Sequence, residues 1–125
     1  MRDTLVVSLD EADALFRPGD TVSGQIEWAF DRAPDSLTLR LFWYTEGRGD
    51  RDVGLAAELS LDTPGAVGSQ RFDLDLPSGP YSFSGRLVSL IWALELIASP
   101  GDLTEKVEIL VSPGDGEIEL GRATA

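Results

Sequence analysis

Hydrophobic and polar residues alternate one by one along most of this chain. Between Thr21 and Phe30 every second residue is apolar, with Gly24 in register and mostly polar side chains between. A period of two is typical of a β-strand that buries one face. The same pattern predicts further strands over Thr4–Leu9, Ser36–Glu46, Val53–Leu61, Arg71–Leu76, Leu90–Ile97, Lys106–Val111 and Glu117–Leu120. About eight strands are therefore expected, and only Asp10–Phe16 suits a helical turn in passing.

Turn-forming residues separate these segments. Pro18-Gly19-Asp20 places a proline where φ is preset and a glycine where a positive φ is tolerated, and similar groups recur down the chain. Many short strands at a spacing of roughly ten residues predict an all-β, immunoglobulin-like antiparallel sandwich. No linker-like composition divides residues 1–125, so we expect a single β-sandwich domain with a core of its own.

The acidic composition changes the expected partners. Twenty-two acidic residues stand against ten basic ones, and the net charge is -12. Such a field repels phosphate backbones and anionic lipids, so nucleic acid is not expected as a partner. The longest apolar run, Leu87–Ala98, is too short for membrane insertion as a helix. A basic partner and mere solubility both remain open as interpretations of the charge.

Cysteine and histidine are both absent. Their absence excludes disulfides, thiolate metal sites and a Ser-His-Asp triad, and it removes the commonest general base. We therefore expect no enzyme, no catalytic residue and no cofactor. The first residues lack the long apolar stretch of a signal peptide, which favours a cytoplasmic protein. The preference for Arg over Lys, with many Ala and Gly, suggests a bacterial source.

Two segments are more specific than the strand pattern. The first is Phe16-Arg17-Pro18-Gly19-Asp20-Thr21-Val22-Ser23-Gly24, an aromatic residue and a Pro-Gly-acid turn that lead into a strand. The second runs from Leu76-Pro77 through Tyr81-Ser82-Phe83-Ser84-Gly85 to Trp92. In this order and spacing they resemble the amino-terminal lobe of the arrestin superfamily, which is related to retromer and bacterial sporulation-control proteins. The resemblance covers roughly Thr4 to Val111.

The resemblance implies an arrestin-type lobe and a non-enzymatic adaptor that binds proteins. Arrestins have two lobes and this chain has room for one, so a homodimer that restores the two-lobed shape is a hypothesis. Phospho-receptor recognition is not expected, because the basic residues that it needs are scattered here among acids, as at Arg2, Arg40, Arg71 and Lys106. The motif residues have structural explanations. Gly24 allows a bulge or a close backbone approach, and Phe83 plugs one end of the sandwich.

A candidate partner-binding surface lies off the main apolar faces of two strands. Phe42 and Tyr44 are on the otherwise polar side of theirs, and Ile91 and Ile97 are off the main apolar face of another. Together they can form a second hydrophobic surface that a protein partner covers, or one that the chain's own loops cover. The predicted function is therefore a protein-protein interaction or scaffold module.

A β-sandwich that binds calcium or carbohydrate is the alternative. Oxygen ligands for calcium can come from Asp10, Glu11 and Asp13, from Asp50 and Asp52, or from Asp115 and Glu117. None of these groups has the dense spacing of a known calcium loop, which favours their interpretation as solvated acids in turns. A sugar-stacking platform can be drawn from Trp28, Trp43 and Trp92, but Trp28 and Trp92 fall on apolar faces, which favours core packing. Paired carboxylates for glycoside hydrolysis have no cue beyond abundance.

Overall fold

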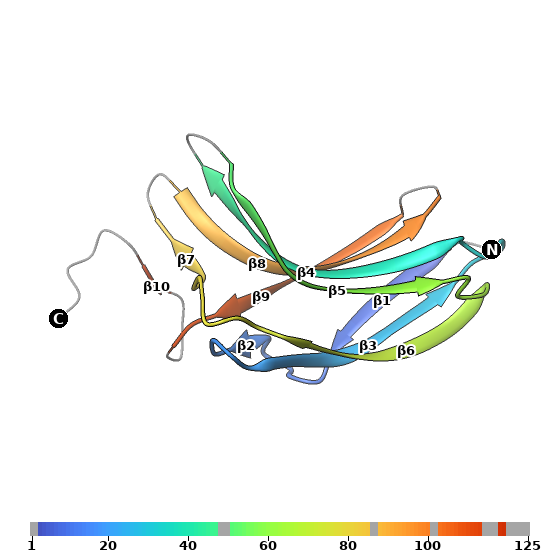
Figure 1. Ribbon diagram of the computed structural model, residues 1–125, viewed down its shortest axis with the longest axis horizontal. Helices are drawn as coiled ribbons and strands as arrows, with labels where there is room; N and C mark the ends of the chain where they lie inside the picture. Colours follow the sequence, from blue (N-terminus) through green and yellow to red (C-terminus); the bar gives the residue numbers. More distant parts are fainter. Residues whose placement is uncertain (1–2, 48–50, 86–87, 101–102, 114–117, 120–125) are drawn as a thin grey trace.

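In the computed structural model, every regular element among the described residues is a β-strand (Figure 1). The structure describes residues 3–47, 51–85, 88–100, 103–113 and 118–119. The strands are β1 (Thr4–Leu9), β2 (Leu15–Phe16), β3 (Thr21–Ala29), β4 (Ser36–Gly47), β5 (Val53–Asp62), β6 (Val67–Asp75), β7 (Phe83–Ser84), β8 (Val88–Ser99), β9 (Thr104–Val111) and β10 (Ile118–Glu119). Within these described ranges there is no helix that could cross a membrane.

Two sheets pack face to face as a sandwich. The smaller sheet has the antiparallel order β1-β3-β6. The larger sheet has the order β10-β7-β8-β4-β5, with β9 beside β8 and β2 beside β9. In Figure 1 the β4-β5 hairpin and the start of β8 rise away from the smaller sheet at one end of the sandwich, while β9 descends toward β2. The predicted all-β sandwich is confirmed.

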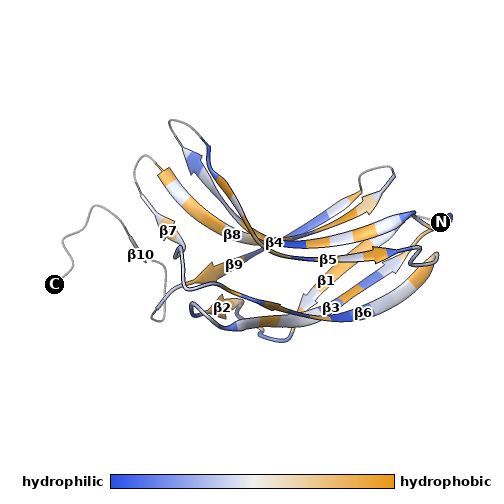
Figure 2. Ribbon diagram, viewed as in Figure 1, coloured by the Kyte–Doolittle hydropathy of each residue, from blue (hydrophilic) through white to orange (hydrophobic). Residues whose placement is uncertain are grey.

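The core lies between the inner faces, where the period of two places the apolar residues. Figure 2 shows hydrophobic and hydrophilic positions alternating along the long strands. Leu37, Leu39 and Leu41 of β4 are fully buried, as are Trp92, Leu94 and Leu96 of β8. Val22 and Ile26 of β3 cover them from the smaller sheet. Each buried leucine contributes about 2 kcal/mol by removal of apolar surface from water.

The two segments that carried the family resemblance meet at one end of the sandwich. The amide of Gly19 donates to the carbonyl of Pro77 (3.2 Å), and the amide of Leu76 donates to the carbonyl of Asp20 (2.8 Å). The indole Nε1 of the buried Trp92 donates to the carbonyl of Pro80 (2.8 Å). These hydrogen bonds fix the loop after β6 over the end of the core.

The last residues of β9 complete this end. Phe16 of β2 pairs with Val111 in parallel register. The amide of Ser82 donates to the carbonyl of Val111 (2.7 Å), and the amide of Val111 donates to the hydroxyl of Ser82 (3.0 Å). Phe83 is half-buried and packs against the core, as expected of a residue that plugs the sandwich.

Glycines let aromatic rings lie directly on neighbouring strands. A Cβ at Gly24 would collide with the carbonyl oxygen of Ser8 and lie 2.8 Å from Cζ of Phe72, its cross-strand partner. The predicted close backbone approach at Gly24 is therefore confirmed. Trp28 covers Gly68 in the same way. The strand β6 begins at Val67, four residues before the predicted start, because residues 67–70 pair with the end of β3.

The remaining differences from the predicted strands are short elements. β2 and β7 are two-residue strands that alternation over longer windows does not detect. β2 occupies the end of the segment that suited a helical turn. The last predicted strand is described only at Ile118–Glu119, which pairs in parallel with β7. Its predicted ends, Glu117 and Leu120, lie outside the described residues.

Candidate functional site

The four residues of the predicted surface lie on the outer face of the larger sheet, and three of them are close together. Tyr44 of β4 is the cross-strand partner of Ile91 of β8. The rings of Phe42 and Tyr44 are stacked, with centroids 5.8 Å apart and an interplanar angle of 26°. All are half-buried. Ile97 faces the same side but pairs with Thr38 near the far end of β8, so it does not join the other three.

Two further apolar side chains extend this surface. Val53 pairs with Tyr44, and Leu55 pairs with Phe42, both on β5 at the sheet edge. Their exposed fractions, 69% and 59%, are among the highest of the large apolar residues in the described part of the chain. We call Phe42, Tyr44, Val53, Leu55 and Ile91 the outer patch.

A β-bulge explains why strict alternation missed Val53 and Leu55. Alternation places them on the inner face with Leu59 and Leu61, but the register between β4 and β5 shifts after Leu41. Leu41 pairs with Ala57 and Phe42 pairs with Leu55, so Ala56 is an extra residue. One extra residue turns every side chain before it to the opposite face. Two small adjacent alanines are the only sequence signal at that place.

A row of charged side chains borders the outer patch. The register places Glu58 of β5 beside Arg40 of β4, Arg40 beside Glu95 of β8, and Glu95 beside Lys106 of β9. Nε of Arg40 donates to the carboxylate of Glu58 (2.9 Å). A hollow of about 460 Å³ lies between the row and the patch, and it is lined by Arg40, Phe42, Val53, Leu55, Glu58 and Glu95.

Lys106, the sole lysine, crosses from the charged row to the patch. Its Nζ donates to the hydroxyl of Tyr44 (2.9 Å) and lies 4.8 Å from the centroid of the Tyr44 ring. The Tyr44 hydrogen bond raises the pKa of Lys106 above its ordinary value, with further support from the charges of Glu108 and Glu95 and opposition from desolvation. The lysine therefore stays protonated over the aromatic end of the patch.

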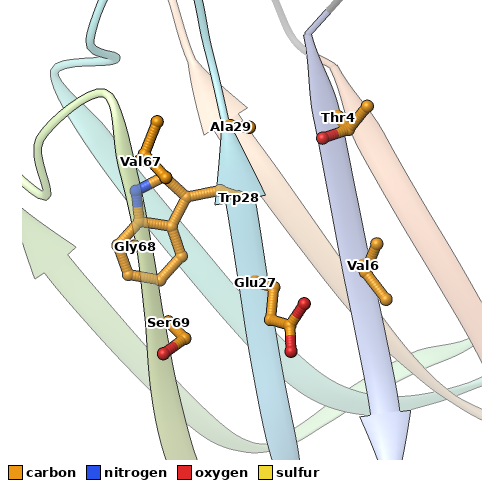
Figure 3. A pocket seen from close by; sticks show the side chains of 8 residues that line it. All are labelled: Thr4, Val6, Glu27, Trp28, Ala29, Val67, Gly68 and Ser69. Carbon is orange, nitrogen blue, oxygen red and sulfur yellow. The ribbon is translucent and has the colours of Figure 1, made fainter.

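The outer face of the smaller sheet is mainly polar. Arg71 of β6 donates to both carboxylate oxygens of Asp10, at 2.9 and 2.5 Å. This hydrogen bonding lowers the pKa of Asp10, and desolvation opposes it. At one end of the face a second hollow of about 460 Å³ is lined by Thr4, Val6, Glu27, Trp28, Ala29, Val67, Gly68 and Ser69 (Figure 3). Val6 and Val67 are its exposed apolar residues.

The residues considered for a calcium or carbohydrate site do not come together in the described part of the structure. Within that part of the chain no group of three or more His, Cys, Asp or Glu side chains could hold a metal ion. Asp10 is engaged by Arg71, whereas Asp50, Asp115 and Glu117 lie outside the described residues. Trp28 and Trp92 are buried, and Trp43 packs against the core. The tryptophans therefore do not form an exposed platform for a sugar.

Comparison with known proteins places the fold. No protein-family model matches the chain. No curated protein matches it either. Among solved structures, Spo0M, a sporulation control protein from Bacillus subtilis, matches with a TM-score of 0.63 over 87% of this chain. The chain has an arrestin-like fold. The resemblance predicted from the two motifs is thereby confirmed as a likeness of fold.

The arrestin-like chain corresponds to only part of that protein. The match covers 49% of Spo0M, so the chain spans about half of its length, and the sequence identity is 14%. At that identity the comparison describes the arrangement of strands and not a shared partner. The description as a sporulation control protein belongs to Spo0M alone.

Proposed function

We propose that the chain is a non-enzymatic protein-interaction or scaffold module that binds a protein partner through the outer patch. The observation that carries the proposal is the exposure of adjacent apolar side chains, with Val53 at 69% and Leu55 at 59% beside the stacked rings of Phe42 and Tyr44. Isolated apolar residues on a surface need no explanation, but a contiguous group with a charged border is typical of a binding surface.

An adaptor role fits the fold that the chain shares with Spo0M. The sequence contains no histidine or cysteine, so the commonest general base and a thiol nucleophile are both missing. We propose that the module works without a cofactor and in the bacterial cytoplasm, as expected from its sequence.

Replacement of Leu55 by Asp tests the outer patch. The residue is exposed, so Leu55→Asp should change the free energy of unfolding by no more than about 0.5 kcal/mol. Val67→Asp is the matched control, because Val67 is 73% exposed on the other sheet. The native and both variant proteins are immobilised, and partners are captured from an extract of the source organism and then purified. The affinity of a purified partner should fall about tenfold or more with Leu55→Asp and stay unchanged with Val67→Asp.

Equal affinity of that partner for the native protein and for Leu55→Asp would overturn the proposal. Thermal unfolding of each variant accompanies the binding measurement, so that a loss of affinity is not confused with a loss of fold. The homodimer remains a separate prediction. Light scattering at micromolar concentration tests it, and a strict monomer removes that hypothesis.

A further inference from the structure

The outer patch continues to an open edge of the larger sheet. Among the described strands, β5 pairs only with β4, so its other edge presents N–H and C=O groups without a strand partner. Natural edge strands are usually protected by Lys, Pro or a bulge. β5 has the sequence VGLAAELSLD, which contains no Lys, Arg or Pro, and its one irregularity is the bulge at Ala56. Outside the bulge, this edge is protected only by the negative charges of Glu58 and Asp62, which a basic segment would neutralise.

The edge also carries an excess of negative charge. In the hollow beside the patch Arg40 lies between Glu58 and Glu95, and Lys106 lies on the far side of Glu95. Glu58 at the β5 edge therefore has Arg40 alone as a basic neighbour in this row. Asp62 adds a further carboxylate at the end of β5. The whole chain has a net charge of -12. If a basic side chain of a partner paired with Glu58, Arg40 could pair with Glu95 instead. Both carboxylates would then have a basic partner.

We propose that the β5 edge binds an extended segment of another protein that carries apolar residues at two alternate positions and Lys or Arg at the next alternate position, all on the same face. The proposal rests on the function proposed above and names the chemistry of the partner. In strand addition the main chain provides affinity, and alternate side chains provide specificity. The added strand places apolar side chains beside Val53 and Leu55, and it places a basic side chain beside Glu58.

A second copy of the chain fits this edge less well. The β5 strand of that copy would bring its own Glu58 and Asp62 and no basic residue. Two copies would also bring together two chains that each carry a net charge of -12. Like charges placed opposite each other in a sheet are destabilising. The charge pattern therefore favours a basic segment from a different protein.

Selection of ten-residue peptides from a random phage-displayed library tests the proposal. The intact chain is the target, and Val53→Asp is used for counter-selection. Enriched peptides should carry apolar residues at two alternate positions and Lys or Arg at the next alternate position. A synthetic copy of an enriched peptide is then measured by fluorescence anisotropy. Its affinity should fall about fivefold with Glu58→Gln and stay unchanged with Glu27→Gln, an exposed glutamate on the smaller sheet.

Amide hydrogen exchange distinguishes strand addition from contact with side chains alone. The edge-facing amides of β5 should exchange rapidly in the free protein and become protected when the synthetic peptide is added. Enrichment of acidic or uncharged peptides, equal binding to Val53→Asp, or binding without protection of β5 would each overturn the proposal. So would protection of β5 that depends on protein concentration alone, because it would identify a second copy as the occupant.

The two proposals fail in different ways. If Leu55→Asp loses a natural partner while no basic peptide binds at β5, the partner chemistry is wrong and the proposed function stands. If Leu55→Asp keeps every partner, the outer patch itself is not the binding surface.

Discussion

The two outer faces of the sandwich differ in the contacts that their side chains make. On the smaller sheet, the hydroxyls of Thr21 and Ser23 donate to Asp75 and Asp73 of the neighbouring strand, at 2.8 and 2.5 Å. Arg71 holds Asp10 on the same face. On the larger sheet, the outer patch leaves apolar side chains in contact with solvent. The smaller sheet joins these polar side chains by hydrogen bonds and exposes Val6 and Val67 at one end, whereas the larger sheet exposes the adjacent apolar side chains of the outer patch.

That difference follows from short-range pairing. Polar side chains on neighbouring strands satisfy each other wherever the register places a donor opposite an acceptor. No such pairing is available to Val53 or Leu55, which gain only by leaving water. The faces therefore predict different responses to mutation. Changes in the smaller sheet should affect stability or its pH dependence, and changes in the outer patch should affect binding.

The largest expected effect comes from disruption of the smaller sheet at Gly24. Gly24→Ala would place a Cβ against the carbonyl oxygen of Ser8 and 2.8 Å from the Phe72 ring. Since a backbone atom cannot rotate away, β1 and β3 must separate, and the free energy of unfolding should fall by about 3 kcal/mol. Urea unfolding measures the change. Gly79→Ala is the control, because a Cβ there meets nothing within 4 Å. Equal stability of the two variants would contradict the close approach.

A smaller effect is expected from the ion pair on the polar face. In the folded protein the pKa of Asp10 is lowered from its ordinary value of 3.8 by the hydrogen bond from Arg71. The unfolded chain therefore binds the Asp10 proton more tightly. The contribution of Asp10 to stability is fully present above the ordinary value and is lost as pH falls through the lowered pKa.

Urea unfolding from acid to neutral pH tests this contribution. The stability advantage of the native protein over Asp10→Asn should be present near pH 7 and should disappear at strongly acid pH. Arg71→Gln should show the same profile, and the double variant should add little, because either single change removes the pair. An advantage over Asp10→Asn that is independent of pH would show that the ion pair does not contribute in solution.

The smallest expected effect concerns the lysine over the outer patch. Because Lys106 is the sole lysine, reductive methylation with a carbon-13 label gives one side-chain signal besides the terminal amine, which titrates at lower pH. The pKa from this signal should lie above the ordinary value of 10.5 and should fall in Tyr44→Phe. Any stabilisation by the contact is present below the ordinary pKa and is lost as pH rises through the raised one. An unchanged pKa in Tyr44→Phe would show that the contact does not form.

Much of the fold could be predicted from the sequence because burial and alternation agree along the chain. The inner-face leucines of β4 and the long strand around Trp92 lie as their period of two indicates. The turn at Pro18-Gly19 and the segment after Leu76 were recognisable from their composition. Their mutual hydrogen bonds were not, because those depend on how the two sheets meet.

The candidate site could be predicted only in part. The sequence grouped Phe42, Tyr44 and Ile91 on one surface because each is apolar on the side of its strand opposite the main apolar face. Val53 and Leu55 could not be found, since an extra residue at Ala56 changes their face without changing their hydrophobicity. Local pattern reports which residues are apolar. The register between strands decides which of them a partner can reach.

The pairing of Phe16 with Val111 has a consequence for synthesis of the chain. The end of the sandwich needs the turn before β3, the loop after β6 and the last residues of β9 at the same time. An emerging chain therefore cannot close this end until Val111 has left the ribosome, although most of both sheets is already available. Contacts between residues so distant in sequence also slow folding. Until Val111 emerges, the apolar strands of the nascent chain are exposed at this end and can associate with other chains.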